Sequence, residues 1–383
     1  MATYIAELPI MGWGSAPGDI GVLKEMAECG LNVAGFVAPE HLDLVEEAGL
    51  KAFVMDRRAS GYDFRNVDPD MARQNADSLV EEVGSHPALM GYYLKDEPSA
   101  EEFPGLALVT ENFLENDARN IPYINLYPNY ANQQQLGTEN YWDHIEGYIT
   151  TVNPPIISYD HYALMEREPL REGYFANLEI IRWASIKYKR HFWNVVLTTA
   201  HFGYREPSEA DIRFQAFTTL AYGGKGISYF TYFAPPSGNC RMSPIDHFGR
   251  RTLTWSYLQR VNSMVRMLAP TIMQLDSLGV YHVGNIPAGC SQLPGNTLVR
   301  ALHGNGDFVI GEFIHSDGSN YIMVVNKDFD YSANFRLTLN NPGSSLQRVS
   351  SFSGRLEELV DDGDWLAPGQ GVLLCVVQKE YKV

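Results

Sequence analysis

The chain has 383 residues, of which 45% are hydrophobic, 12% aromatic and 20% charged. This composition excludes a disordered or fibrous chain, and the length corresponds to two or three domains. The 29 basic and 46 acidic side chains give a net charge of −17. We therefore expect neither nucleic acid nor an anionic membrane surface as a partner, whereas neutral ligands remain open.

The N-terminal segment and the cysteines indicate little about location. No apolar stretch approaches the roughly 20 residues that span a bilayer, and MATYIAELPIMGWGS lacks a basic segment followed by an apolar one. We expect either a cytoplasmic protein or one whose signal peptide was removed before this numbering begins. Four cysteines (Cys29, Cys240, Cys290 and Cys375) lie far apart without a CxxC pair, which argues against structural zinc and leaves disulfides open.

Short apolar runs alternate with longer stretches of helical period in the first part of the chain, a pattern typical of parallel strands joined by helices. The predicted strands are Pro9–Gly14, Asn32–Val37, Lys51–Met55, Leu89–Asp96, Pro122–Tyr127, Pro155–Tyr162, Phe192–Thr199 and Gly226–Phe233. Helical signals lie between them: Asp70 begins a run that continues to Val83, and Ser208 with Asp211 resembles a capping box. Eight such units in about 270 residues predict a (β/α)8 TIM barrel, with a doubly wound sheet as the alternative.

The period changes from about Gly279 onward, where β-branched runs are separated by turn residues. The predicted strands here are Thr297–Leu302, Asp307–Ile314, Asn320–Val325, Ala333–Leu339 and Gly371–Val377. We therefore predict a (β/α)8 barrel over residues 1–272 and a C-terminal antiparallel β-sandwich domain over residues 273–383. Nothing in this second domain resembles an exposed aromatic platform, so we expect it to support the barrel, with a role as a binding module as the alternative.

The reacting groups of a (β/α)8 barrel lie at the carboxyl ends of its strands. The fourth predicted strand ends in two adjacent acids, Asp96 and Glu97, followed by Pro98. Period-two alternation predicts that Tyr93, Lys95 and Glu97 share one face of this strand. We expect that face to look into the mouth of the barrel.

The sixth predicted strand supplies a further acid. Alternation places Ser158, Asp160 and Tyr162 on one face, so Glu97 and Asp160 are expected to converge across the barrel mouth. Cleavage of a glycosidic bond needs two such carboxylates, one protonated to assist the leaving oxygen and one ionised as base, nucleophile or charge stabiliser. The alternative is that Asp96 and Glu97 are ordinary loop acids in an acidic chain.

Aromatic and amide side chains gather at the other strand ends, a combination that suits the apolar faces and hydroxyl edges of sugars. The predicted substrate-binding residues are Trp13, Asp96, Asn125, Tyr127, His161, Tyr162, His201 and Tyr232. Phosphate-binding loops and a GxSxG elbow are absent from the sequence. His161, His201 and His247 could collect a metal with a carboxylate, but strand-end histidines more often orient substrate, so we predict neither a metal nor another cofactor.

Several strings resemble a known group of proteins over nearly the whole chain. With the downstream β domain, YYLKDEPS, INLYPNYA, ISYDHYALMERE, YFANLEIIRW and FQAFTTLAYGGKGISYFTYFAPP look like (β/α)8 glycoside hydrolase-like proteins. The resemblance implies a carbohydrate substrate, and a role in polysaccharide degradation would imply a secreted or periplasmic location. It leaves the oligomeric state open.

The chain departs from the familiar retaining barrel glycosidases, which carry Asn-Glu at the end of strand four and a second Glu at the end of strand seven. Here the pair is Asp96-Glu97, and strand seven ends LTTAH without an acid. A two-glutamate mechanism would therefore require Glu206 to fold back into the cleft. Chitinase-like barrels are similar in carrying an acid at the end of strand four and a Tyr-Asp pair on strand six, here Tyr159 and Asp160.

The sequence thus predicts a glycoside hydrolase with Glu97 as the general acid and Asp160 as the second catalytic carboxylate. Burial against Tyr93 and the neighbouring Asp96 are expected to raise the pKa of Glu97. Two alternatives remain, a non-catalytic carbohydrate-binding barrel, in which Asp160 turns away or pairs with a cation, and a metal-dependent hydrolase. The sugar, the linkage, the anomeric configuration and the stereochemical outcome do not follow from the sequence.

Overall fold

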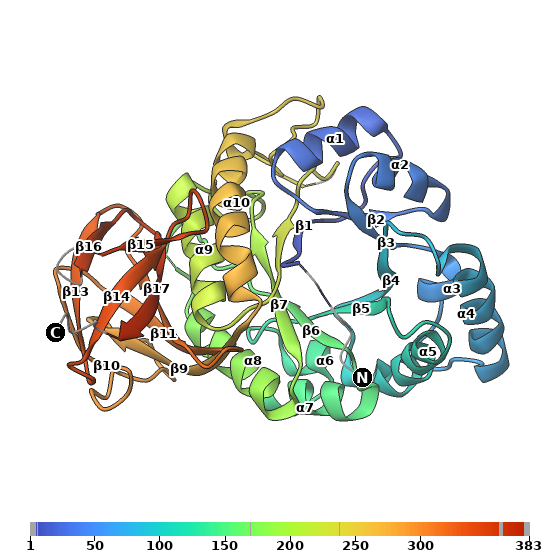
Figure 1. Ribbon diagram of the computed structural model, residues 1–383. Helices are drawn as coiled ribbons and strands as arrows, with labels where there is room; N and C mark the ends of the chain where they lie inside the picture. The colour runs from blue at the N-terminus through green and yellow to red at the C-terminus, as the bar shows by residue number, and fades with distance from the viewer. Residues whose placement is uncertain (1–4, 6, 169, 237, 360–362, 379–383) are drawn as a thin grey trace. The chain divides into compact units, whose positions relative to one another are not determined.

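The computed structural model describes residues 5–378 except 6, 169, 237 and 360–362. A closed barrel of eight parallel strands in chain order forms the first part of the fold (Figure 1). These strands are β1 (Ile10–Trp13), β2 (Val33–Val37), β3 (Lys51–Val54), β4 (Leu89–Asp96), β5 (Ile121–Leu126), β6 (Ile156–Asp160), β7 (His191–Leu197) and β8 (Ile227–Phe230). The predicted barrel is confirmed, and the doubly wound alternative is wrong because β8 pairs with β1.

Helices separate the barrel strands and follow β8. They are α1 (Ile20–Glu28), α2 (Leu42–Glu47), α3 (Arg57–Ser60), α4 (Pro69–Val83), α5 (Phe103–Asn116), α6 (Gln133–Leu136), α7 (Tyr141–Val152), α8 (Tyr174–Tyr188), α9 (Glu209–Ala221) and α10 (Leu253–Ile272), with short 3-10 turns η1 (Pro39–His41) and η2 (Ala100–Glu102). Ser208 and Asp211 form the predicted capping box of α9. Helix α4 begins one residue before the predicted Asp70, because Asp68 caps its backbone amides.

Apolar and aromatic side chains fill the barrel interior. The core consists of Met11, Val33, Phe36, Phe53, Ile121, Tyr123, Ile156 and Trp193. Strands β1 and β2 approach closely at Gly35, whose φ of +98° lies in the region that favours glycine. A Cβ at Gly35 would lie 2.3 Å from the carbonyl oxygen of Gly12, so this close approach depends on the absence of a side chain.

In the described part of the chain after β8, nine further strands form two antiparallel sheets. They are β9 (Leu275–Val283), β10 (Val299–Gly304), β11 (Phe308–His315), β12 (Asn320–Asn326), β13 (Ala333–Leu339), β14 (Ser344–Val349), β15 (Leu356–Glu358), β16 (Gly363–Leu366) and β17 (Gly371–Gln378). One sheet has the order β10-β13-β16 and the other β15-β14-β17-β12-β11-β9. Side chains from both sheets, among them Phe308, Ile322 and Phe335, share one core, which confirms the predicted β-sandwich.

The expectation that the β domain lacks an exposed aromatic platform is wrong. Trp365 in β16 is 60% exposed, and Phe352, in the turn after β14, is 88% exposed. The sequence alone does not separate Trp365 from core aromatics, because a short strand at a sheet edge has too few residues to show which face each side chain takes.

The chain forms two compact units that do not follow chain order. The first comprises Met1–Tyr162, Ile180–Val196 and Gly226–Phe233, and the second the remainder. The first unit contains the barrel strands except Leu197, and the second contains the β domain with α9 and α10. Because α10 ends at Ile272, a division of the chain between residues 272 and 273 remains our proposal for the domain boundary.

Candidate active site

The end of strand β4 is irregular, and this irregularity decides which acid faces the barrel interior. The pairs between β4 and β5 are Tyr93 with Tyr123, Lys95 with Ile124 and Asp96 with Asn125. Leu94 is therefore an extra residue, a β-bulge. Since Tyr123 and Asn125 lie two residues apart in β5 they share a face, and Tyr93 and Asp96 share that face with them.

The predicted alternation along strand four is thus wrong beyond Tyr93. Lys95 lies on the opposite face, where its Nζ is 3.0 Å from Oε1 of Glu102. Glu97 follows the strand in the left-handed region, with φ of 46°, and its backbone N–H donates to the carbonyl oxygen of Asn125 at 2.8 Å. The bulge brings Asp96 into the barrel, and the turn at Glu97 keeps the second acid beside it.

An amide connects the acids of strands β4 and β6. The Nδ2 of Asn125 donates to Oδ1 of Asp160 at 2.9 Å and to Oδ1 of Asp96 at 3.2 Å. Its Oδ1 accepts from the Ser158 hydroxyl at 2.9 Å, and that hydroxyl lies 2.8 Å from the Tyr123 hydroxyl. The amide oxygen of Asn125 accepts the hydrogen bond from the Ser158 hydroxyl, so the amide is oriented with both of its N–H groups toward carboxylates.

We call Asp96, Glu97 and Asp160 the acid cluster, and all three are harder to ionise than in water. Burial raises the pKa of Asp96 to about 6, against the hydrogen bond from Asn125. Burial and the charge of Asp96 raise the pKa of Glu97 to about 7, in the predicted direction. Burial, then Glu97 and then Asp96 raise the pKa of Asp160 well above its usual value. Burial and mutual repulsion therefore favour the protonated forms of these three acids.

Aromatic side chains from neighbouring strand ends lie beside the acid cluster. The ring of Phe230 lies 5.6 Å from Trp13 and 5.0 Å from Tyr162. Burial and the charges of the cluster, that of Asp160 first, raise the pKa of Tyr162. Burial and then Glu97 raise the pKa of Tyr127. The structure thus brings several predicted binding residues together around the acids.

Other predicted binding residues have different surroundings. The ring of His161 is fully buried and lies 5.0 Å from Tyr130. Tyr232 is 1% exposed. His201 belongs to the second unit, where its Nδ1 lies 2.8 Å from the carbonyl oxygen of Thr199. Their roles in binding stay predictions.

Two further residues support the cluster: Tyr123, which the sequence did not single out, and Ser158, which was predicted only to share a face with Asp160. Tyr123 and Ser158 hold the orientation of Asn125. The available signal was a tyrosine two residues before an asparagine in a buried strand, since buried polar groups need hydrogen-bond partners. Glu206, the acid considered for strand seven, accepts a hydrogen bond from Nε of Arg241 at 2.9 Å. This ion pair gives Glu206 a partner within the second unit.

Two groups of three metal-ligating side chains occur among the described residues. They are Glu179, His282 and Cys290, and Asp43, Glu46 and His86, each with ligand atoms within 4.8 Å of one another. In the first group Nε2 of His282 lies 3.0 Å from the Tyr222 hydroxyl, and its Nδ1 lies 3.4 Å from Nζ of Lys327. Both ring nitrogens are therefore already engaged, and neither group includes a member of the acid cluster.

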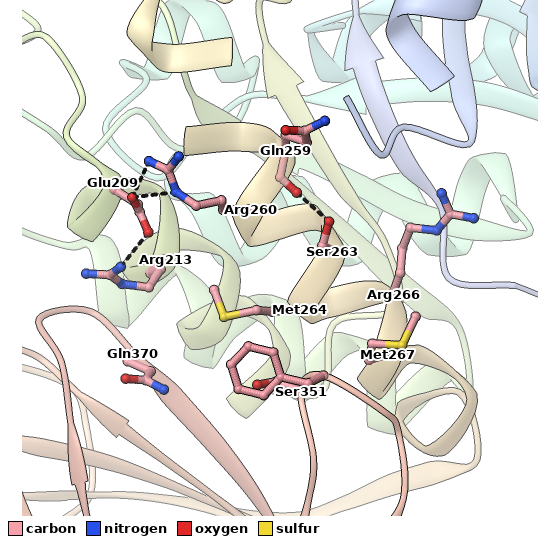
Figure 2. A pocket seen from close by; sticks show the side chains of 11 residues that line it. Glu209, Arg213, Gln259, Arg260, Ser263, Met264, Arg266, Met267, Ser351 and Gln370 are labelled. Atoms are coloured by element: carbon pink, nitrogen blue, oxygen red, sulfur yellow. Dashed lines mark hydrogen bonds and ion pairs between the residues drawn. The ribbon is translucent and has the colours of Figure 1, made fainter. Parts of the chain in front are cut away.

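A pocket of about 560 Å³ lies in the second unit, lined by α9, α10 and segments of the β domain (Figure 2). Glu209 lies there between two arginines. Its Oε1 accepts from Nη1 of Arg213 at 2.8 Å, and its Oε2 accepts from Nε and Nη2 of Arg260 at 2.9 and 2.6 Å. These charge-assisted bonds place Glu209 in an ion-pair network with two guanidinium groups.

Solved structures share the fold of this chain, whereas no family model and no curated protein matches it. A β-galactosidase from Bacillus circulans sp. alkalophilus is 9% identical with a TM-score of 0.63, covering 97% of this chain and 99% of that one. A glycoside hydrolase family 5 protein from Bacteroides vulgatus ATCC 8482 is 11% identical with a TM-score of 0.61, covering 98% and 91%. The β-galactosidase from the psychrophilic Marinomonas ef1 is 12% identical with a TM-score of 0.51. This match covers 68% of this chain and only 60% of the length of that protein.

At these identities the likeness shows the fold. The chain has a (β/α)8 barrel and a C-terminal β domain similar to those of glycoside hydrolases, in agreement with the resemblance seen in the sequence. None of the helices in the described part of the chain is long and apolar enough to cross a membrane.

Proposed function

We propose that the protein is a glycoside hydrolase in which Glu97 donates a proton to the leaving oxygen and Asp160 is the second catalytic carboxylate. The observation that carries the proposal is the acid cluster at the carboxyl ends of β4 and β6, in which burial and Asp96 raise the pKa of Glu97 to about 7. A general acid is most effective when its pKa lies near the working pH. The fold similarity supports a carbohydrate as the substrate.

The other members of the site have supporting roles in this proposal. Asn125 holds Asp96 and Asp160 through one amide group. The bond between the anomeric carbon and the leaving oxygen breaks as Glu97 gives up its proton, and an ionised carboxylate in a desolvated site stabilises the positive charge that develops on the sugar. A water molecule then adds to the anomeric carbon and loses a proton, which completes hydrolysis. Trp13 and Tyr162 offer aromatic surface, and Tyr127 adds a ring near Glu97.

The surroundings of Asp160 favour catalysis over a purely binding barrel. A non-catalytic barrel would pair this acid with a cation or turn it away. Asp160 instead accepts a hydrogen bond from the neutral amide of Asn125, and its largest charge interactions are repulsions from Glu97 and Asp96. Repulsion between neighbouring acids lowers the stability of the fold. Such an arrangement is typical of sites where a reaction needs a shifted pKa.

The test compares Glu97→Gln with Glu111→Gln, a change of an exposed glutamate on α5. Both variants and the wild type are assayed on alkyl glycosides and unmodified oligosaccharides, whose leaving oxygen needs a proton. We expect Glu97→Gln to lose about 10²- to 10⁴-fold in kcat/KM, or roughly 3 to 5 kcal/mol of barrier stabilisation, because the proton donor is removed.

Glu111→Gln should match the wild type, and both variants should unfold cooperatively. Saturable sugar binding by the wild type without turnover would contradict the proposal and favour the binding barrel. Full activity of Glu97→Gln would remove Glu97 as the acid. Loss of wild-type activity in a chelator, restored by a divalent metal, would favour the metal-dependent alternative.

A further inference from the structure

The outer face of the three-stranded sheet presents an exposed indole. Leu366 in β16 points into the sandwich core, so the preceding Trp365 points to the opposite face. That indole is 60% exposed, although tryptophan is usually largely covered in folded proteins. Tryptophan is among the residues enriched at binding surfaces, where its ring packs against a partner and its N–H can donate a hydrogen bond.

Strand register places polar side chains around this ring. In the pairing of β13 with β16, Asn334 lies opposite Trp365, and Arg336 lies opposite Gly363. In the pairing of β10 with β13, His303 lies opposite Arg336. Thr338 completes the set, with its hydroxyl 3.4 Å from Nε2 of His303. We call Asn334, Arg336, Thr338, His303 and Trp365 the Trp365 face.

The residue types of the Trp365 face suit a sugar chain. The apolar face of a pyranose ring stacks on an aromatic platform such as the Trp365 indole, and amide, hydroxyl, guanidinium and imidazole groups bond to its hydroxyl edge. Opposite side chains on neighbouring strands lie about 5 Å apart, so Asn334 is within reach of a ring stacked on the indole. A sheet face is open along the strands, which fits an extended chain better than an enclosed monosaccharide.

Charge decides between a neutral and an acidic sugar chain. The protein carries a net charge of −17, and a polyanion is repelled by such a field. Arg336 and His303 are the basic side chains of the Trp365 face, too few to offset the net charge of the whole protein. A neutral polysaccharide therefore fits this surface better than a polyuronate.

We propose that the Trp365 face is a second glycan-binding site, which binds a neutral polysaccharide independently of the acid cluster. The inference deepens the proposed function, since the bound polysaccharide would carry the bonds that the barrel cleaves. The two can still fail separately, because binding at the Trp365 face is measured without turnover.

The experiment is native affinity electrophoresis through gels that contain xyloglucan, galactomannan, mixed-linkage β-glucan, amylose or polygalacturonate. The protein carries Glu97→Gln so that the polysaccharide is not consumed, and Trp365→Ala, Trp365→Tyr and Phe352→Ala are added singly. Phe352 is the matched control because it is an even more exposed aromatic residue, 88%, outside the Trp365 face.

We expect at least one neutral polysaccharide to retard the parent protein. Trp365→Ala should weaken that binding about tenfold or more through the loss of stacking, Trp365→Tyr should restore part of it, and Phe352→Ala should leave it unchanged. On the wild-type background, Trp365→Ala should keep full activity on small aryl glycosides.

Several results would overturn the proposal. These are no retardation by any neutral polysaccharide, equal retardation of the parent and Trp365→Ala, and retardation by polygalacturonate alone. A fourth is a dimer, seen in sedimentation, that Trp365→Ala dissociates without any effect on glycan binding, which would assign the face to a second copy of the chain. None of these results bears on hydrolysis by the barrel, which the Glu97 variants test.

Discussion

At the scale of single residues, one amide group holds two of the three acids. Asn125→Asp would replace the donor between Asp96 and Asp160 with a further carboxylate. We expect the pKa values of the cluster to rise, the alkaline limb of the kcat/KM profile to move to higher pH, and activity near neutrality to fall about 100-fold.

The pH dependence of kcat/KM for this variant is the measurement. Asn66→Asp, at an exposed asparagine in the loop before α4, is the control and should leave the profile unchanged. An unshifted profile in Asn125→Asp would show that the amide does not set the ionisation of the acids.

The acid cluster also predicts how stability depends on pH. A carboxyl group whose pKa is raised on folding stabilises the fold fully below its usual pKa of about 4, and this contribution is lost as the pH rises through the folded value. For Asp96 and Glu97 the folded values are about 6 and about 7, so the loss falls between about pH 4 and 7. The pKa of Asp160 is raised as well.

Asp160→Asn should therefore become more stable relative to the wild type as the pH increases, because it removes a carboxylate that is costly to ionise. Thermal unfolding at pH 4, 6 and 8 measures the difference in Tm. Asn66→Ser, which changes no ionisable group at an exposed position, is the control, and its difference should be the same at each pH. A constant difference for Asp160→Asn as well would mean that Asp160 is not destabilised in its ionised form.

The acids at the strand ends can be predicted from the sequence, but the geometry between them cannot. Asp96-Glu97 and Asp160 follow apolar strands and stand out by position alone. The β-bulge at Leu94 cannot be recognised from the sequence, because a leucine fits a regular strand and a bulge equally well. Alternation therefore places Lys95 on the inner face, where the structure has Asp96.

At the scale of elements, the close approach of β1 and β2 predicts that a side chain at Gly35 destabilises the fold. Gly35→Ala adds a Cβ 2.3 Å from the carbonyl oxygen of Gly12 at a φ of +98°. We expect destabilisation by roughly 2 kcal/mol or more, since the strands must separate and the backbone is strained.

Gly147→Ala in α7 is the control, because its Cβ would meet Phe103 at an ordinary 3.8 Å and alanine favours a helix by about 0.5 to 1 kcal/mol. Chemical denaturation measures both variants. Equal stability of Gly35→Ala and the wild type would mean that β1 and β2 can separate at no cost.

The strands differ in how well their sequences reveal them. Barrel strands are buried on both faces and appear as short apolar runs, so the sequence predicts all eight to within a few residues of their ends. In the β domain, β14 and β15 have the sequences SSLQRV and LEE, which show little apolar alternation. Such strands are held by their neighbours in the sheet, and local sequence does not predict them.

At the scale of the whole molecule, helix α9 links the β domain to the preceding chain. All of its residues except Glu209 and Arg213 are buried, and in the second unit it packs on β11, β12 and β17. Its Phe214 lies 4.6 Å from the ring of Phe329. The fragment 1–272 would remove these contacts and expose one face of the helix.

We therefore expect the fragment 1–272 to bind a hydrophobic dye and to lack a cooperative thermal transition, whereas the full chain should melt cooperatively. Circular dichroism melting and dye fluorescence are the measurements. A cooperative transition at the Tm of the full chain would show that the proposed boundary at 272/273 also separates independently folding parts.

The most direct test of proton donation by Glu97 is how the loss of activity in Glu97→Gln depends on the leaving group of the substrate. A dinitrophenol leaves without a proton, whereas a sugar or an alkyl alcohol needs one. For Glu97→Gln, kcat/KM should therefore fall about 10²-fold or more on an alkyl glycoside or disaccharide and remain within a few fold of the wild type on the matching dinitrophenyl glycoside. An equal loss on both substrates would contradict the account.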